Sequence, residues 1–199
     1  MSTYLRRDLY LNVVHPIRDK KKIELMKSYL RGKSKRDYLL FMVGISSALR
    51  ISDILRLKIK HIWINNKPAD FIELHEKKTG KYKRFPVTPN LAKAIREYMA
   101  EISDPNPENY VFRSRVGENK PITRQQAVLI LNQACDMCSI PDRFGTHGMR
   151  KTWGYWAFKS GISLDYISLA LNHRSIAETK RYLGLLQEDL DNIYLQVNL

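Results

Sequence analysis

Two strand-like segments joined by a short turn interrupt an otherwise helical pattern near the middle of the chain. The segments DFIELHEKK and KYKRFPV carry aromatic and β-branched residues with local alternation, and Thr79-Gly80 between them suits a tight turn. The segment HIWIN, just before them, has the same character. We therefore expect an α+β fold that is mostly α-helical and contains one small three-stranded antiparallel sheet.

The segments on both sides of this sheet have the apolar spacing of amphipathic helices. Before it, helices are predicted within HPIRDKKKIELMKSYL and around residues 39–45, followed by a short helix capped by Ser52. After it, the expected helix starts are Thr88 or Asn90, a capping box formed by Thr123 and Gln126, and Thr146.

Charge is the first indication of function. The 199 residues carry a formal net charge of +14, with Lys and Arg along the whole chain. A folded basic domain attracts polyanions, so nucleic acid is the favoured partner; the alternative is a merely solvated basic surface. No stretch approaches the roughly 18 apolar residues of a membrane helix, and no signal peptide is evident. We therefore expect a cytoplasmic protein without membrane association.

Cys135 and Cys138 form a C-x-x-C, a spacing found in zinc and redox sites. They lie in a helical pattern, with Cys135 on a similar face to Val128 and Leu131. No second C-x-x-C or H-x₃-H completes the usual four zinc ligands. We therefore expect core thiols and no metal.

Two separate segments place cations where they suit a phosphate. GTHGMRKT puts His147 and Arg150 three residues apart at a helix start, on one face and beside free amides. In ALRISDILRL, Arg50 follows apolar residues, and if it turns inward it needs an anion. Asp53 either is that anion or orients Arg50 toward a phosphate.

The segment HRSIAETKRYLG, close to the end of the chain, contains His173 and Tyr182. An unbroken helix would place them on opposite faces, at about 100° per residue. Ser175 and Glu178 form a capping box, however, so a new helix starts between them. His173 then lies in the turn and Tyr182 two turns into the helix, which can bring both to one place. The alternative is that Tyr182 packs among the neighbouring leucines.

Taken in order, these motifs resemble those of the tyrosine recombinases, the phage integrase family. ALRISDILRL is similar to the family's first-arginine motif, THGMRKT to its H-x-x-R box and LALNHRSIAETKRYL to its L-G-H…Y box. The family's hairpin lysine aligns with Lys78 in KTGK, and Lys77 is the rival on the opposite strand face. The resemblance covers residues 15–190 and implies that the catalytic residues are Arg50, Lys78, His147, Arg150, His173 and the nucleophile Tyr182, supported by Asp53.

The resemblance implies a site-specific recombinase that cleaves and rejoins DNA through a 3′-phosphotyrosine intermediate, without metal, cofactor or ATP. The arginines would bind the phosphate and His173 would donate to a non-bridging oxygen. Lys78 would protonate the leaving 5′-oxygen, and His147 would take the tyrosine proton or position the phosphate. Because a phenol with a pKa near 10 is a poor nucleophile, we expect surrounding cations to lower the pKa of Tyr182.

The resemblance also bears on partners and domains. Expected DNA-backbone contacts are Lys81, Lys83, Arg84, Lys151 and Arg174. We expect a leader over 1–14, a catalytic domain over 15–182, a C-terminal tail helix over 183–199 and no N-terminal core-binding domain. The chain is then a minimal recombinase or the catalytic half of a larger one. The apolar tail either packs in cis or docks on another protomer of a dimer or tetramer on double-stranded DNA; DNA-bending proteins are further candidate partners.

Two residues depart from the family pattern, and two other functions compete with recombination. Asn172 stands where Gly is usual, which left-handed backbone geometry tolerates in Asn, and Lys151 stands where His is frequent. One rival is a non-enzymatic DNA-binding protein of the helix-turn-helix type, with Ser175 starting the recognition helix. The other is a type IB topoisomerase, which shares the chemistry but needs no specific site.

Overall fold

The computed structural model describes residues 14–103, 105–141, 144–145, 147–185, 194–195 and 197. Its helices are α2 (Lys20–Lys33), α3 (Lys35–Ser47), α4 (Ile51–Ile54), α5 (Ile59–Ile62), α6 (Pro89–Met99), α7 (Arg124–Met137), α8 (Gly148–Lys159), α9 (Leu164–Ala170) and α10 (Ile176–Leu183). Its strands are β1 (Trp63–Ile64), β2 (Lys67–Pro68), β3 (Phe71–His75) and β4 (Tyr82–Pro86). The prediction of a mostly helical α+β fold is confirmed.

The strands form two separate antiparallel pairs, β1 with β2 and β3 with β4, so the expected three-stranded sheet is wrong. The chain turns back directly after β1, because Asn65 and Asn66 both adopt positive φ angles, 51° and 58°, as a tight hairpin turn requires. In the β3–β4 hairpin, Ile72 lies opposite Phe85, and Leu74 lies opposite Lys83. Opposite residues share a face, so Lys83 is on the same face as the buried Ile72 and Phe85.

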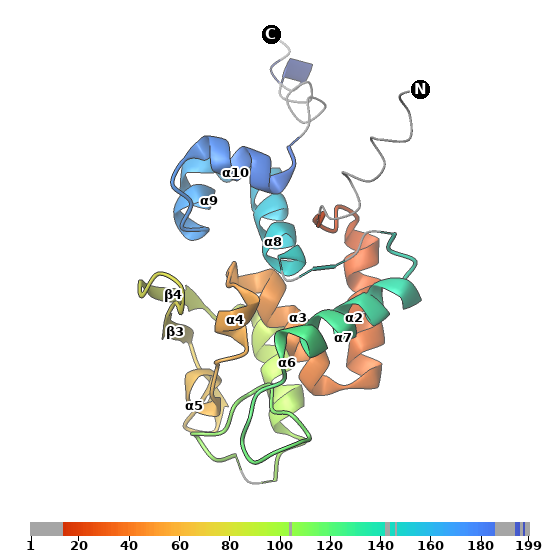
Figure 1. Cartoon of the computed structure of the whole chain (residues 1–199), viewed down its shortest axis with the longest axis vertical. Helices are drawn as coiled ribbons and strands as arrows, with labels where there is room; N and C mark the ends of the chain where they lie inside the picture. The colour runs from red at the N-terminus through yellow and green to blue at the C-terminus, as the bar shows by residue number, and fades with distance from the viewer. Residues whose placement is uncertain are drawn as a thin grey trace.

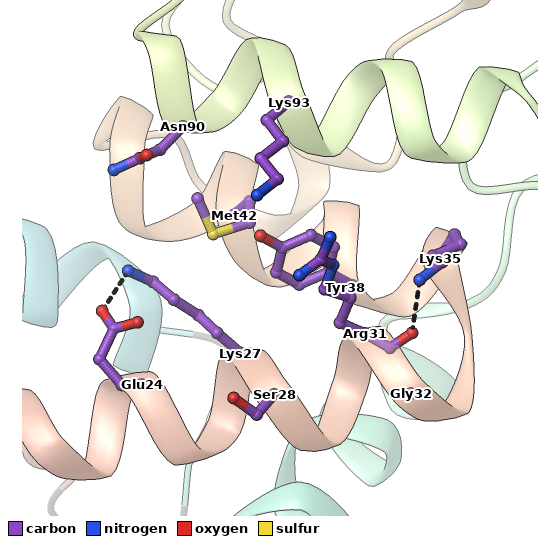
Figure 2. A pocket seen from close by; sticks show the side chains of 10 residues that line it. All are labelled: Glu24, Lys27, Ser28, Arg31, Gly32, Lys35, Tyr38, Met42, Asn90 and Lys93. Carbon is purple, nitrogen blue, oxygen red and sulfur yellow. Dashed lines mark hydrogen bonds and ion pairs between the residues drawn. The ribbon is translucent and has the colours of Figure 1, made fainter.

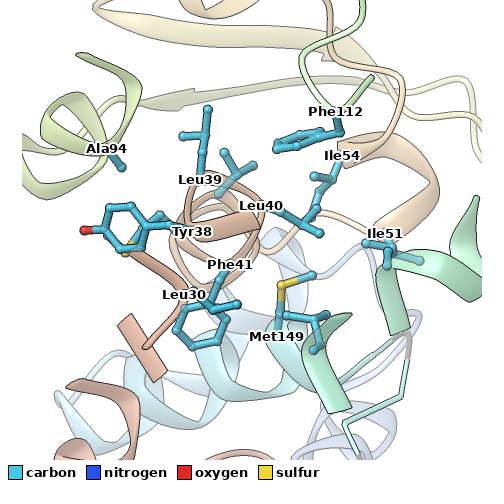
Figure 3. Packing of buried hydrophobic residues seen from close by; sticks show 14 of the residues in the cluster. Leu30, Tyr38, Leu39, Leu40, Phe41, Ile51, Ile54, Ala94, Phe112 and Met149 are labelled. Carbon is cyan, nitrogen blue, oxygen red and sulfur yellow. The ribbon is translucent and has the colours of Figure 1, made fainter. Parts of the chain in front are cut away.

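Helix α3 is the centre of the large hydrophobic core (Figure 3). Leu39, Leu40 and Phe41 on this helix are fully buried, together with Leu30 on α2 and Ile54 on α4. A helix that is apolar on most sides must be surrounded, and α2, α6 and α8 all pack against α3. The core therefore fixes the end of α3, from which Arg50 follows, relative to α8.

Most of the predicted helix starts are present. Thr88 caps α6, and Thr123 and Gln126 form the predicted capping box of α7. The Ser52 prediction is wrong, because α4 begins at Ile51 with Arg50 as its N-cap. Thr146 lies outside the described residues. Both Cys135 and Cys138 are buried in the large core.

A second, small cluster holds α9 (Leu164–Ala170) and α10 (Ile176–Leu183). Its buried members are Ala48, Ile167, Leu171 and Leu183, with Trp153, Phe158 and Tyr182 among the partly buried residues packed against them. Figure 1 shows α9 and α10 together beyond α8, away from the bundle of α2, α3, α6 and α7, with the β3–β4 hairpin beside α4. The predicted leader and most of the predicted tail lie outside the described residues. Within the described part, no helix is both long enough and apolar enough to cross a membrane.

Candidate active site

The separated motifs converge around Tyr182 on α10. The Tyr182 ring lies between two imidazoles, with centroid distances of 4.8 Å to His173 and 6.2 Å to His147, both edge-on. The break predicted between His173 and Tyr182 is present: the Ser175 side chain caps α10 by accepting from the Glu178 amide at 3.1 Å. Both of these imidazoles and the phenol thus lie together within one chain.

The Tyr182 hydroxyl is buried, and no described residue makes a well-aligned hydrogen bond to it. Burial raises the pKa of the phenol to about 12, although the nearby Arg150 and Arg50 charges act to lower it. The expectation that cations lower this pKa is therefore wrong for the DNA-free protein. The cost of burying a phenolate exceeds the stabilisation by the cations, so Tyr182 is protonated and must lose its proton as it reacts.

Arg150, in the first turn of α8, is only 2% exposed. Its guanidinium donates to the backbone carbonyls of Ala48, at the end of α3, and Leu171, just after α9. Burial lowers its pKa, but an arginine stays charged at any physiological pH. Arg150 thus connects the C-terminal end of α3 to the turn that carries His173.

Arg50 pairs with a carboxylate that the sequence reasoning missed. Its Nη1 lies 2.9 Å from Oε2 of Glu76, whereas the expected partner Asp53 accepts instead from the Lys77 amide at 2.8 Å. Asp53 is fully buried. Its bond to the Lys77 amide holds the start of the hairpin turn, and no ion pair with Arg50 is formed. The alternation of DFIELHEKK was an available signal, because Ile72, Leu74 and Glu76 occupy one face of the strand.

Lys83 also differs from its expected role as a DNA-backbone contact. Its ammonium donates to the Ala170 carbonyl at 2.7 Å, and burial together with the Arg150 charge lowers its pKa to about 8. Lys83 therefore belongs to the internal cluster of cations. The same strand alternation that selects Glu76 would have separated Lys83 from its outward neighbour Arg84. Lys78 is exposed in the hairpin turn.

The other predicted residues lie around this cluster. His173 Nδ1 is 3.0 Å from Thr179 Oγ1, a contact that orients the ring, and burial lowers the pKa of both His173 and His147. Lys151, predicted to contact DNA, lies 5.1 Å over the Tyr182 ring as a cation–π contact. Lys81, Arg84 and Arg174 are exposed.

A groove of about 530 Å³ lies apart from these residues, between α2, α3 and α6 (Figure 2). Its cations are largely neutralised within the protein: Arg31 pairs with Glu97 at 2.5 Å and Lys27 with Glu24 at 2.6 Å. Among the described residues, no group of three or more His, Cys, Asp or Glu is placed to hold a metal ion. The chemistry-bearing residues therefore gather around Tyr182.

A buried tyrosine hydroxyl beside two arginines and two histidines defines a class of protein that transfers phosphoryl groups through a covalent tyrosine intermediate. Residues 17–188 match the family model for the Phage integrase family, and the chain belongs to that family. Its activity class is accordingly that of the DNA recombinases.

Two relatives show how much of a recombinase the chain represents. It is 40% identical over 175 residues to the probable integrase/recombinase YoeC of Bacillus subtilis (strain 168), covering 88% of this chain and 92% of that protein. It is 26% identical over 162 residues to a tyrosine recombinase of Pseudothermotoga lettingae, covering 81% of this chain but 54% of that protein. The chain thus spans nearly the whole of one relative and about half of the other.

Solved structures have the same fold. The crystal structure of XerA recombinase matches with a TM-score of 0.75 and 18% identity, covering 93% of this chain and 66% of that one. XerH recombinase bound to a palindromic difH substrate matches with a TM-score of 0.68 and 16% identity, covering 92% of this chain and 53% of that one. The fold is that of a tyrosine recombinase catalytic domain.

Proposed function

We propose that the chain cleaves and rejoins strands of double-stranded DNA at specific sites, with Tyr182 as the nucleophile. The observation that carries the proposal is the buried Tyr182 hydroxyl beside the Arg150 guanidinium. The ring that bears this hydroxyl contacts the imidazoles of His147 and His173 edge-on. The net charge of +14 supports attraction to the DNA backbone.

In the proposed reaction, Tyr182 Oη attacks a backbone phosphorus and forms a 3′-phosphotyrosine, while the bond from phosphorus to the 5′-oxygen breaks. Arg50 and Arg150 stabilise the negative charge that develops on the phosphate, since guanidinium groups form planar pairs of hydrogen bonds with phosphate oxygens. His173 donates to a non-bridging oxygen. The energy of the broken bond is retained in the phosphotyrosine, so a 5′-hydroxyl can reverse the step without ATP.

Two proton transfers accompany this step. Burial raises the pKa of Tyr182 to about 12, so its proton must leave during the attack, and we assign His147 to accept that proton or to position the phosphate. Lys78 protonates the leaving 5′-oxygen once the hairpin turn meets DNA. A substrate with a sulfur in place of that 5′-oxygen needs no such proton, because a thiolate leaves readily without one. This substrate should therefore restore cleavage by the Lys78→Ala variant but not by the Arg150→Ala variant.

Beyond the single site, we propose that Lys81, Arg84 and Arg174, all exposed, contact the DNA backbone. We also propose that protomers pair on DNA through the C-terminal tail, with DNA-bending proteins as further partners in the cytoplasm. Analytical ultracentrifugation of DNA complexes, formed with the whole chain and with a variant truncated in the tail, measures the number of protomers bound and so tests pairing through the tail.

The proposed chemistry is tested with nicked duplexes of randomised sequence, in which loss of a short strand traps the covalent complex. We expect protein–DNA adducts that survive denaturation and that Tyr182→Phe does not form. DNA binding without adducts at saturating DNA would instead favour a non-enzymatic binding protein. Relaxation of supercoiled plasmids without regard to sequence would favour a topoisomerase.

A further inference from the structure

We infer that Glu76 is a positioning residue for strand cleavage: one oxygen of its carboxylate holds together three segments that carry Arg50, Lys78 and His173. This inference rests on the proposed function. Arg50 Nη1 lies 2.9 Å from Glu76 Oε2, as an ion pair and not an aligned hydrogen bond. Thr79 Oγ1 donates to the same oxygen at 2.7 Å, and Asn172 Nδ2 does so at 2.8 Å.

Such burial of a carboxylate is costly and needs a reason. Glu76 is only 1% exposed, although it lies at the end of a hairpin strand where an exposed glutamate would be ordinary. Burial acts to raise the pKa of its carboxyl, but the Thr79 hydrogen bond and the Arg50 charge outweigh it and lower that pKa. Glu76 is therefore ionised at neutral pH and is held in place by these partners.

Each partner of Glu76 is adjacent to, or is itself, a residue of the proposed reaction. Thr79 follows Lys78 in the hairpin turn, and Asn172 precedes His173 in the turn between α9 and α10. Asn172 has a φ of 49°, a left-handed conformation in which glycine would be easier. An asparagine there accepts a strained backbone and contributes the amide that reaches Glu76.

Two further hydrogen bonds hold the same turn before His173. Lys83, on the same hairpin as Glu76, donates to the Ala170 carbonyl, and Arg150 donates to the Leu171 carbonyl. Three consecutive residues, 170–172, are thus held by the hairpin or by α8. These contacts therefore fix the position of the backbone at His173, the next residue.

The geometry favours positioning over inhibition. Glu76 engages one nitrogen of Arg50, whose side chain keeps 17% exposure, so part of the planar fork stays available to a phosphate. The internal cations Arg50, Arg150 and Lys83 outnumber the buried carboxylates Glu76 and Asp53 by one. That excess of one positive charge matches the single negative charge of a DNA phosphodiester.

The test compares Glu76→Gln, Asn172→Gly and the double variant with wild type, and uses Glu73→Gln as the control. Glu73 is an exposed carboxylate on the same hairpin, paired with Arg84 at 3.1 Å. Asn172→Gly removes only the amide, since glycine adopts the left-handed backbone without strain. Two quantities are measured: the single-turnover rate of adduct formation on the nicked duplexes and the Kd for an uncleaved duplex.

For Glu76→Gln we expect adduct formation to slow about 30-fold, with DNA bound as tightly as by wild type or more tightly, because a negative charge is lost. Asn172→Gly should slow it about fivefold, and the double variant should be no slower than Glu76→Gln, because Asn172 acts through Glu76. The control should keep the wild-type rate of adduct formation.

Wild-type or faster rates in both single variants would overturn the positioning role, and a faster Glu76→Gln would indicate inhibition. If Glu76→Gln does not fold, by far-UV circular dichroism, Asn172→Gly alone decides. Failure of wild type itself to form adducts would overturn the proposed function. Adduct formation by wild type and by equally fast variants would remove only the inference about Glu76.

Discussion

The large core and the small cluster hold the candidate site from opposite sides, and they differ in extent. The large core surrounds α3 and fixes α4 and the start of α8, and with them Arg50 and Arg150. The small cluster, with four buried members among the described residues, holds α9 and α10, and with them His173 and Tyr182. An element with few buried apolar contacts opens locally at a lower free energy than the whole domain. Arg50 and Arg150, the proposed phosphate-binding cations, thus lie on the more extensively packed side, and Tyr182, the proposed nucleophile, lies on the side that opens at the lower free energy.

Arg150 follows Met149 of the large core and donates to two residues of the small cluster, so replacing it should have the largest effect. Its guanidinium donates to the carbonyls of Ala48 and Leu171. A lysine ammonium lacks the planar, forked donor geometry that is needed to keep both bonds and also bind two phosphate oxygens. For Arg150→Lys we expect adduct formation to slow by about 10³-fold and the free energy of unfolding to fall by about 2 kcal/mol. Single-turnover cleavage and urea unfolding measure the two effects.

Arg96→Lys is the matched control, because Arg96 is exposed on α6 and is not among the proposed DNA contacts. It should leave both quantities nearly unchanged. If Arg150→Lys cleaved DNA at the wild-type rate, the two regions would not depend on the guanidinium that connects them.

The same glycine-to-alanine change distinguishes the two regions directly. On Gly44 of α3, a methyl group would lie 2.8 Å from Met149 Cβ, deep in the large core, where the backbone of α8 must shift. On Gly154 of α8, it would lie 2.6 Å from Leu183 Cδ2, the free end of a side chain. We expect Gly44→Ala to lower the free energy of unfolding by about 3 kcal/mol and Gly154→Ala by under about 1 kcal/mol.

Urea unfolding of both variants gives these values, and the cleavage assay adds a second distinction. Because Leu183 follows Tyr182, Gly154→Ala should slow adduct formation more than its small loss of stability explains. Equal losses of stability in the two variants would show that α10 is held as firmly as α3.

Truncating one leucine in each region tests how independently α10 opens. Leu183 and Leu40 are both fully buried. By hydrogen exchange, Leu183→Ala should reduce amide protection in α10 by about 2 kcal/mol while α3 keeps its protection. Leu40→Ala should reduce protection in both helices. Loss of protection in α3 on truncation of Leu183 would mean that the molecule opens only as one unit.

The sequence predicted local features well and long-range pairings poorly. The hairpin around Thr79-Gly80 and the caps at Thr88, Thr123 and Ser175 depend on neighbouring residues, and they are present. The third strand was wrong because the competing turn at Asn65 was not recognised.

Pairings across the fold depend on tertiary contacts that no local pattern encodes. Asp53, three residues away, was one candidate partner for Arg50, whereas the observed partner is Glu76 at the end of the distant strand β3. The raised pKa of Tyr182 was missed for the same reason, since its cause is burial by elements far apart in the chain. The inward position of Lys83 could have been predicted from strand alternation and was overlooked.

Lys83 is tested by a change in how stability depends on pH. Burial, then the Arg150 charge, lowers the pKa of Lys83 from 10.5 to about 8. Between these pH values the unfolded chain binds more protons at this position than the folded protein, so its contribution to the free energy of unfolding rises with pH. Lys83→Met should lose this rise in the free energy of unfolding. The rise should be below about 3 kcal/mol, because Lys83 is only partly buried and solvent screens its charge.

Urea unfolding at several pH values between 8 and 10.5 gives the difference between wild type and Lys83→Met, in which the titrations of other groups cancel. Lys81→Met, an exposed change on the same hairpin, controls for the loss of one positive charge and should give a curve parallel to wild type. A parallel curve for Lys83→Met as well would mean that Lys83 is as solvated as Lys81. The hairpin would then not form part of the firmly held, cation-rich side of the site.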